Sequence, residues 1–220
     1  MQRHDLLRVD LLAWQAMLAE HPGLTGVALV ADWVSHDWPV IVRRLVAGDP
    51  VEGVPAALPL PPCYGKQRVG FSFPSKLGVA ARSAVLLRDA ARAAPAAWQP
   101  VITALIDLGE ATGIEPRVFG ALLWQHVTGL SYLTAHSDLD LLWAVPDATT
   151  AAALLPGLRR IDANSPFRLD GEVELPGGGG VNWRELAQAA DTGCGDVLVK
   201  AMQGVTTHPV AELFTMAPAS

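Results

Sequence analysis

The chain has 220 residues, 50% of them hydrophobic, and a formal net charge of −6. This length fits one large domain or two small ones, and the apolar half suffices for a sizeable core, which excludes the class of intrinsically disordered proteins. The acidic balance argues against a nucleic-acid partner, because broad nucleic-acid binding depends on clustered lysine and arginine. A small polyanionic substrate remains compatible, since it needs only a local cluster of basic side chains.

The cysteines and the hydrophobic segments favour a cytoplasmic location. Cys63 and Cys194 are far apart and have neither disulfide-framework nor metal-ligand spacing, so we expect two reduced thiols. The first residues contain no signal-peptide core. The longest uncharged stretch, residues 118–137, carries polar side chains that fit a buried helix and turn better than a membrane span. We therefore expect a cytoplasmic protein without a membrane partner.

The first third of the chain is predicted to form a small α+β domain over residues 1–75. In chain order, the patterns predict a helix capped by Asp10, a strand, a connector and a second strand, over residues 11–20, 39–45, 50–62 and 67–73. The connector is rich in proline, which removes backbone donors and disfavours helix, so we expect it to be extended or turning.

The remainder, residues 76–220, mixes helices and strands without regular βαβ alternation. Apolar spacing predicts helices over residues 78–94, 99–111 (stopping at Gly113), 149–161 and 183–190, and a turn at Gly120 with a helix inside 115–127. Strands are predicted over residues 138–145, 167–175, 181–183 and, as the last one, 196–200. This order predicts an α+β domain with a mixed β-sheet flanked by helices.

Asp138 and Asp140 stand two residues apart at the start of an apolar strand pattern. Successive strand side chains point to opposite faces, so these two carboxylates are predicted to share a face. Adjacent carboxylates repel each other unless a cation lies between them, and Mg²⁺ (or Mn²⁺) is the usual occupant beside substrate phosphates. We therefore predict that both are catalytic and bind a metal ion. The alternative is a turn-capping aspartate followed by a solvated one.

A glycine turn upstream offers a phosphate-binding element. Gly120 and Ala121 begin a predicted helix. Glycine allows close backbone approach to a ligand, and a helix N-terminus presents free amide hydrogens and a positive dipole. Both residues are candidate substrate-binding residues, together with Ser137 in the turn before the aspartate pair.

A third carboxylate is expected from a neighbouring strand. Asp170 and Glu172 both lie in the predicted strand over residues 167–175 and share a face. Asp170 is the predicted catalytic residue, because it follows an apolar residue inside the strand, and Glu172 is the alternative. A polar hairpin face without a catalytic role is the other interpretation of each.

Several basic residues are candidate phosphate ligands. Lys66 and Arg68 follow Gly65 in a segment that is not a P-loop, and Lys200 ends the last predicted strand. A solvated turn is the alternative interpretation of the first two. The weaker basic candidates are Arg43, Arg44, Arg168 and Arg184.

The glycine turn, the spacer helix and the Ser-Asp-Leu-Asp sequence at 137–140 resemble the nucleotidyltransferase pattern. At full length the chain resembles the malonate decarboxylase holo-acyl-carrier-protein synthases, which are phosphoribosyl-dephospho-CoA transferases. The stretches that carry this resemblance are HDLL at 4–7, PVIVRR at 39–44, GVPAALPLPP at 53–62, GKQR at 65–68, WQ at 124–125, TGLSYL at 128–133, SDLDLLW at 137–143, DGE at 170–172 and VNWRE at 181–185. The departures are Ala121, where serine is expected, and His136, where glycine is common.

The resemblance implies a nucleotidyltransferase-like domain and a reaction. The phosphoribosyl-dephospho-CoA group would pass from 2′-(5″-triphosphoribosyl)-3′-dephospho-CoA to a serine of the acyl carrier protein subunit of malonate decarboxylase, with release of diphosphate. Two other functions stay open. One is a different nucleotidyltransferase reaction, ATP-dependent adenylylation. The other is a non-catalytic carrier-protein-binding module, which Ala121 slightly favours and the retained aspartates weaken.

Overall fold

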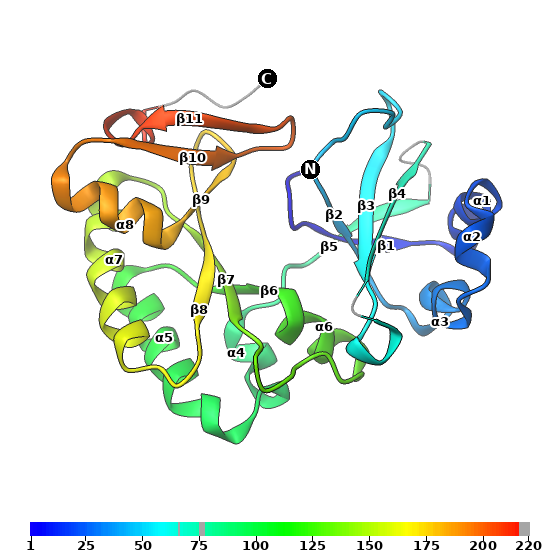
Figure 1. The fold of residues 1–220 in the computed structure, drawn as a ribbon, viewed down its shortest axis with the longest axis horizontal. Coiled ribbons are helices and arrows are strands. Elements are labelled where there is room, and N and C mark those ends of the chain that lie inside the picture. Colours follow the sequence, from blue (N-terminus) through cyan, green and yellow to red (C-terminus); the bar gives the residue numbers. More distant parts are fainter. Residues whose placement is uncertain (66, 75–77, 216–220) are drawn as a thin grey trace. The chain divides into compact units, whose positions relative to one another are not determined.

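The computed structural model describes residues 1–65, 67–74 and 78–215. It contains two compact units, Met1–Ala84 and Val85–Ser220 (Figure 1). Each unit combines helices with its own β-sheet, so the predicted α+β class is confirmed. Lys66, one of the candidate phosphate ligands, lies outside the described residues.

Unit 1 is built on a five-stranded antiparallel sheet in the order β4-β3-β2-β1-β5. Its strands are β1 (Leu6–Val9), β2 (Val40–Val42), β3 (Val54–Pro59), β4 (Arg68–Phe73) and β5 (Val79–Arg82). The strand predicted over residues 67–73 is confirmed as β4, and the strand predicted over 39–45 is confirmed in the shorter β2. β1 was not predicted from the sequence.

Helix α1 (Leu11–Glu20) forms as predicted. The Asp10 carboxylate accepts a hydrogen bond from the backbone N–H of Ala13 at 2.7 Å, which satisfies one of the free amides of the first turn. Trp14 on α1 is fully buried, and its ring centroid lies 5.4 Å from that of Phe71 on β4, so the core of unit 1 lies between α1 and the sheet. The chain then passes through α2 (Pro22–Thr25), α3 (Ala28–Ala31) and the 3-10 turns η1 (Trp33–His36) and η2 (Pro62–Tyr64).

The predicted helix over residues 78–94 is wrong for most of its length. Its first part forms β5, which pairs with β1, and only the short turns α4 (Leu87–Ala90) and η3 (Ala91–Ala93) are helical. The local alanine-rich sequence favours helix, but pairing with β1 decides the conformation of residues 79–82. Because β5 belongs to the first sheet, unit 1 extends to Ala84, whereas the sequence placed the boundary at residue 75.

The proline-rich segment 50–62 was predicted to be a connector, but it contains β3, which lies between β2 and β4. Proline lacks an N–H group, yet its carbonyl can still accept a ladder hydrogen bond. The carbonyl of Pro55 accepts from the backbone N–H of Arg43 at 3.2 Å. The proline content of the segment therefore does not prevent it from forming a strand.

Arg43, a weaker phosphate candidate, is engaged inside unit 1. Its guanidinium donates to both carboxylate oxygens of Asp49, at 2.7 and 2.6 Å, and to the carbonyl oxygen of Phe71 at 3.0 Å. Asp49 also accepts from the hydroxyl of Ser72 at 2.5 Å. The Asp49 side chain is only 7% exposed, and the hydrogen bond from Arg43 holds its pKa well below the usual value. Through their hydrogen bonds to Phe71 and Ser72, Arg43 and Asp49 therefore connect the segment after β2 with β4.

We expect Asp49→Asn to lower the free energy of unfolding by about 3 kcal/mol, because it leaves the partly buried guanidinium of Arg43 without its counter-charge. Since the folded-state pKa of Asp49 lies below its unfolded value, the stabilisation is complete above about pH 4 and is lost as pH falls through the folded-state pKa. Thermal unfolding of the wild type and the variant between neutral and acidic pH measures the difference.

The matched control for this prediction is Asp37→Asn, which removes the exposed partner of Arg8 and Arg82 in the same unit. Exposed ion pairs contribute about 0–1 kcal/mol, so this variant should unfold close to the wild type. Two results would contradict the role assigned to the pair of Arg43 and Asp49. One is an equal loss of stability in both variants, and the other is a loss in Asp49→Asn that stays the same at acidic pH.

Unit 2 is built on a six-stranded sheet in the order β11-β10-β9-β8-β7-β6. The sheet is mixed, as the sequence predicted. Its strands are β6 (Arg117–Phe119), β7 (Leu139–Ala144), β8 (Leu169–Glu174), β9 (Gly180–Asn182), β10 (Asp196–Lys200) and β11 (Val205–Pro209). β7 and β8 are parallel, and the other neighbouring pairs are antiparallel. The prediction that 196–200 is the last strand is wrong, because β11 follows and pairs with β10.

The longer helices of unit 2 are α5 (Gln99–Thr112), α6 (Gly120–Thr128), α7 (Ala148–Ala163) and α8 (Trp183–Thr192), with 3-10 turns η4 (Ala96–Trp98) and η5 (Val210–Glu212). α5 ends at Gly113 as predicted, where φ is +72°. α5, α7 and α8 lie on one side of the sheet (Figure 1). No helix among the described residues has both the length and the apolarity needed to cross a bilayer.

The strand register gives the sheet of unit 2 two chemically different faces. Residues that pair on neighbouring strands point to the same side. Trp143, Val173 and Val181 are aligned and fully or almost fully buried, which marks the apolar face. Asp140 and Asp170 are aligned with each other three positions before Trp143 and Val173, an odd offset, and therefore share the opposite face.

Candidate active site

Two of the predicted catalytic aspartates, Asp140 and Asp170, are neighbours where β6, β7 and β8 lie side by side. Asp140 on β7 pairs with Phe119 at the end of β6 on one side and with Asp170 on β8 on the other. Asp138 lies one residue before β7 begins. Parallel pairing of β7 and β8 thus brings together carboxylates that are about thirty residues apart in the chain, as the sequence interpretation required.

Gly120 places the start of α6 directly against Asp140. Its φ is +67°, a left-handed conformation that glycine adopts without penalty. A Cβ atom added at this position would lie 1.9 Å from Oδ2 of Asp140. Because Gly120 has no side chain, the Asp140 carboxylate can occupy the space where a Cβ atom would otherwise lie. The N-terminus of α6, with Ala121 as its second residue, borders the same carboxylate, so the two predicted features are adjacent.

Ser137 is buried, and its hydroxyl is used within the turn before β7. Its Oγ accepts a hydrogen bond from the backbone N–H of Thr134 at 2.9 Å and lies 3.2 Å from the hydroxyl of Thr134. These contacts fix the entry of the chain into the aspartate pair. A direct contact of Ser137 with substrate stays a prediction.

The two alternatives for the third carboxylate have different surroundings. The side chain of Asp170 is 26% exposed, and its Oδ1 accepts from the backbone N–H of Gly171 at 2.8 Å and from Nδ2 of Asn182 at 2.9 Å. The side chain of Glu172 is 7% exposed, and its Oε1 accepts from Nζ of Lys200 at 2.9 Å. Asp170 therefore has the accessible carboxylate, whereas Glu172 belongs to a largely buried ion pair.

The basic candidates are not all brought to this site. Lys200 lies on β10 and is paired with Glu172 on β8, two strands away, and its side chain is partly exposed. The exposed Arg168 approaches Asp170, with Nη2 3.5 Å from Oδ2. Arg68 is on β4 in unit 1, so unit 2 by itself does not include it.

Arg184 at the start of α8 supports the fold next to the aspartates. It donates to both carboxylate oxygens of Asp162 and to the carbonyl oxygen of Leu169. The pKa of Arg184 is raised, chiefly by the hydrogen bonds to Asp162; burial opposes this rise, and the charges of Asp170 and Asp138 add to it. Both aspartates are therefore close enough to Arg184 to interact with it electrostatically.

The donor set fits a hard divalent cation that is completed by substrate. Among the residues that the structure describes, no three His, Cys, Asp or Glu side chains form a ready-made metal cluster. Mg²⁺ is commonly held by one or two carboxylates while phosphate oxygens and water fill its other positions. Asp138 and Asp140, both partly exposed, match this kind of site.

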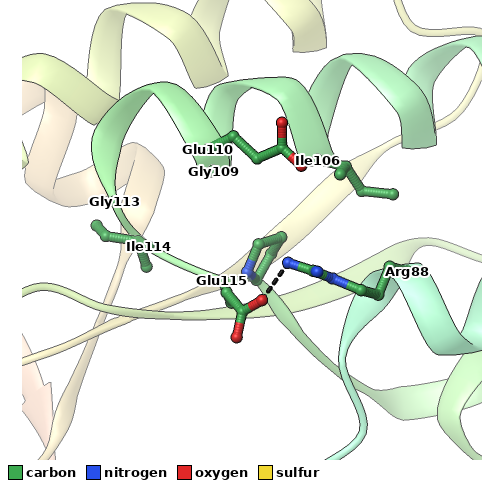
Figure 2. A pocket seen from close by; sticks show the side chains of 8 residues that line it. Arg88, Ile106, Gly109, Glu110, Gly113, Ile114 and Glu115 are labelled. Carbon is green, nitrogen blue, oxygen red and sulfur yellow. Dashed lines mark hydrogen bonds and ion pairs between the residues drawn. The ribbon is translucent and has the colours of Figure 1, made fainter.

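A separate pocket of about 300 Å³ lies at the opposite end of β6 (Figure 2). Arg88 on α4 reaches across it and forms an ion pair with Glu115, and Glu110 on α5 extends over it. Its lining ends at Pro116, just before β6, whereas Gly120 follows β6. None of the predicted site residues lines this pocket.

Asn182 contacts Asp170 through its side chain, and no role was predicted for it from the sequence. It belongs to the VNWRE stretch at 181–185 and immediately precedes the predicted helix over 183–190. Asparagine before a helix is a common N-cap residue, so its contact with the helix could have been predicted. Its contact with Asp170 depends on the pairing of β8 with β9 and was not visible in the sequence.

Two protein-family models match the chain. The model described as phosphoribosyl-dephospho-CoA transferase MdcG N-terminal domain matches residues 2–82, and the model of the corresponding C-terminal domain matches residues 86–211. The division between these matches coincides with the division between the two structural units.

Several relatives carry the name phosphoribosyl-dephospho-CoA transferase. The relative from Xanthomonas euvesicatoria pv. vesicatoria is 38% identical over 221 residues, which cover 99% of each protein. The relative from Xanthomonas axonopodis pv. citri is 38% identical, with 96% of each protein covered. The relative from Bradyrhizobium diazoefficiens is 36% identical, with 92% of this chain and 88% of that protein covered. No solved structure matches the chain.

Proposed function

This chain belongs to the phosphoribosyl-dephospho-CoA transferase family, and from this membership we propose its specific reaction. The phosphoribosyl-dephospho-CoA group passes from 2′-(5″-triphosphoribosyl)-3′-dephospho-CoA to a serine hydroxyl of the acyl carrier protein subunit of malonate decarboxylase. The observation that carries the proposal is the alignment of Asp140 with Asp170 directly against the glycine start of α6. This arrangement joins carboxylates for a metal ion to backbone amides for a phosphate.

The bonds in the proposed step balance without a further reactant. The serine oxygen attacks the phosphorus bonded to the ribose 5″ oxygen. The bond from that phosphorus to the bridging oxygen of the diphosphate breaks, and diphosphate leaves. The serine proton passes to Oδ2 of Asp170, the oxygen opposite the one that accepts from Gly171 and Asn182. The product is a phosphodiester between the carrier protein and the prosthetic group.

Asp138 and Asp140 hold Mg²⁺ or Mn²⁺ in this proposal. When bound, the cation neutralises charge on the triphosphate and on the leaving diphosphate. The amides of Gly120 and Ala121 bind the diphosphate end, which needs no hydroxyl from Ala121. Lys66, Arg68 and Lys200 remain proposed ligands for further phosphate charge. Positioning and charge neutralisation supply most of the catalysis, as is usual for phosphoryl transfer.

Intact-mass measurement tests the reaction directly. We expect the purified chain, incubated with the triphosphoribosyl donor, the apo carrier protein and Mg²⁺, to increase the carrier mass by one phosphoribosyl-dephospho-CoA group. EDTA should prevent the increase, and so should a carrier variant whose acceptor serine is replaced by alanine. A parallel reaction with ATP in place of the donor identifies adenylylation. Carrier labelled only from ATP, or carrier bound but never modified, would refute the proposal.

A further inference from the structure

Asn182 connects Asp170 to the start of helix α8. Its Nδ2 donates to Oδ1 of Asp170 at 2.9 Å. Its Oδ1 accepts from the backbone N–H groups of Arg184 at 3.0 Å and Glu185 at 3.4 Å, which makes Asn182 the N-cap of α8. One amide group thus contacts both the proposed catalytic carboxylate and a ten-residue helix.

The hydrogen-bond partners fix the orientation of this amide. If the Asn182 side chain were flipped, its NH₂ group would face two N–H donors, and its oxygen would face the carboxylate of Asp170. Both contacts would be repulsive. The orientation with Nδ2 toward Asp170 is therefore the one that the surrounding backbone selects, and the helix terminus holds the donor in place.

This contact makes the two oxygens of Asp170 unequal. Oδ1 receives two hydrogen bonds, from Gly171 N at 2.8 Å and from Asn182. Oδ2 lies 3.5 Å from the guanidinium of Arg168, whose side chain is 59% exposed. Oδ1 is the oxygen held by two amide donors, whereas Oδ2 lies only beside the exposed guanidinium of Arg168.

We propose that Asn182 is a positioning residue, which holds Asp170 through Oδ1 so that Oδ2 faces the acceptor hydroxyl. This inference rests on the proposed function, since it assigns a role within that reaction. Partners of this kind, which orient a catalytic or metal-binding group without touching substrate, typically change activity by about 10–100-fold when they are removed.

Asn182→Ser separates positioning from helix capping. Serine is an N-cap as good as asparagine, so α8 keeps its cap, but the short hydroxyl cannot cap the helix and also reach Asp170. We expect kcat for transfer to fall by about 10–100-fold, with KM for donor and carrier within about twofold of the wild type and an unchanged melting temperature. A purely structural role predicts the opposite, since capping by serine would then restore wild-type kcat.

A double-mutant cycle shows whether Asn182 acts through Asp170. Asp170→Ala should lower kcat by itself, and addition of Asn182→Ser should lower it no further, because the carboxylate to be positioned is absent. Independent, multiplicative losses would overturn the inference.

The hydrogen bond between Asn182 and Asp170 can be tested by NMR without metal or substrate, and therefore independently of the proposed function. In NMR spectra of the wild-type protein alone, the Nδ2 hydrogens of Asn182 should be protected from solvent exchange, and Asp170→Ala should remove that protection. Equal exchange in both proteins would overturn the contact itself. If the wild type transfers no group, the proposed reaction and this role in it both fail, while the NMR result still reports the contact.

Discussion

Asp138→Asn is expected to lower the rate of prosthetic-group transfer by about 10³-fold while unit 2 stays folded. The substitution keeps the shape of the side chain and removes the charge that a divalent cation requires. Asp138 lies partly exposed at the entry to β7, so no buried partner is lost that would destabilise the sheet. Intact-mass kinetics with the triphosphoribosyl donor measures the rate, and Mn²⁺ titration measures the affinity for the cation.

Asp107→Asn is the matched control for this experiment. Asp107 is exposed on α5, outside the group of β6, β7 and β8 residues that forms the site. The same change of charge should there leave both transfer and cation affinity unaltered. If Asp138→Asn modified the carrier at the wild-type rate, the assignment of the aspartate pair to the metal would be wrong.

Gly120→Ala is expected to lower transfer by about 10²-fold or more, because displacement of a catalytic group by about 1 Å can cost this much. The new methyl group would occupy the space of Oδ2 of Asp140, only 1.9 Å away, and the carboxylate would have to rotate from its position. Alanine at a φ of +67° also costs about 1–2 kcal/mol of stability. Transfer kinetics and thermal unfolding measure the two effects separately.

Gly129→Ala supplies a control with the same backbone strain and no steric contact. Gly129 ends the same helix, has a φ of +72°, and has no atom within 4 Å of an added Cβ. We expect it to lose stability as Gly120→Ala does and to retain wild-type transfer at a temperature where it is folded. Equal losses of activity in both variants would show that strain in α6, rather than the contact with Asp140, is responsible.

Elements with strong local signals were predictable from the sequence. Asp10 caps α1, Gly113 ends α5 and Gly120 begins α6, because each of these residues acts on the backbone within one turn of itself. The apolar run after Asp138 likewise predicted β7 to within one residue at each end.

The errors have a common physical origin in strand pairing. The alanine-rich segment at 79–82 and the proline-rich segment at 54–59 have compositions that argue against strands, yet both are paired along the first sheet. β11 was missed because its short polar sequence carries little alternation, and its partner β10 supplies the pairing. Pairing joins residues far apart in the chain, and no local pattern records it.

The sequence by itself determined the aspartate pair, the glycine turn and the α+β class, because spacing along one strand and the conformational freedom of one glycine are local properties. The tertiary structure alone decided how Asp170 and Glu172 differ. Both residues lie on the same face of β8. The neighbouring strand β9 gives Asp170 the amide of Asn182, and β10, which pairs with β9, gives Glu172 the ammonium of Lys200. The environment of a carboxylate depends on neighbouring strands, which the chain brings together only when it folds.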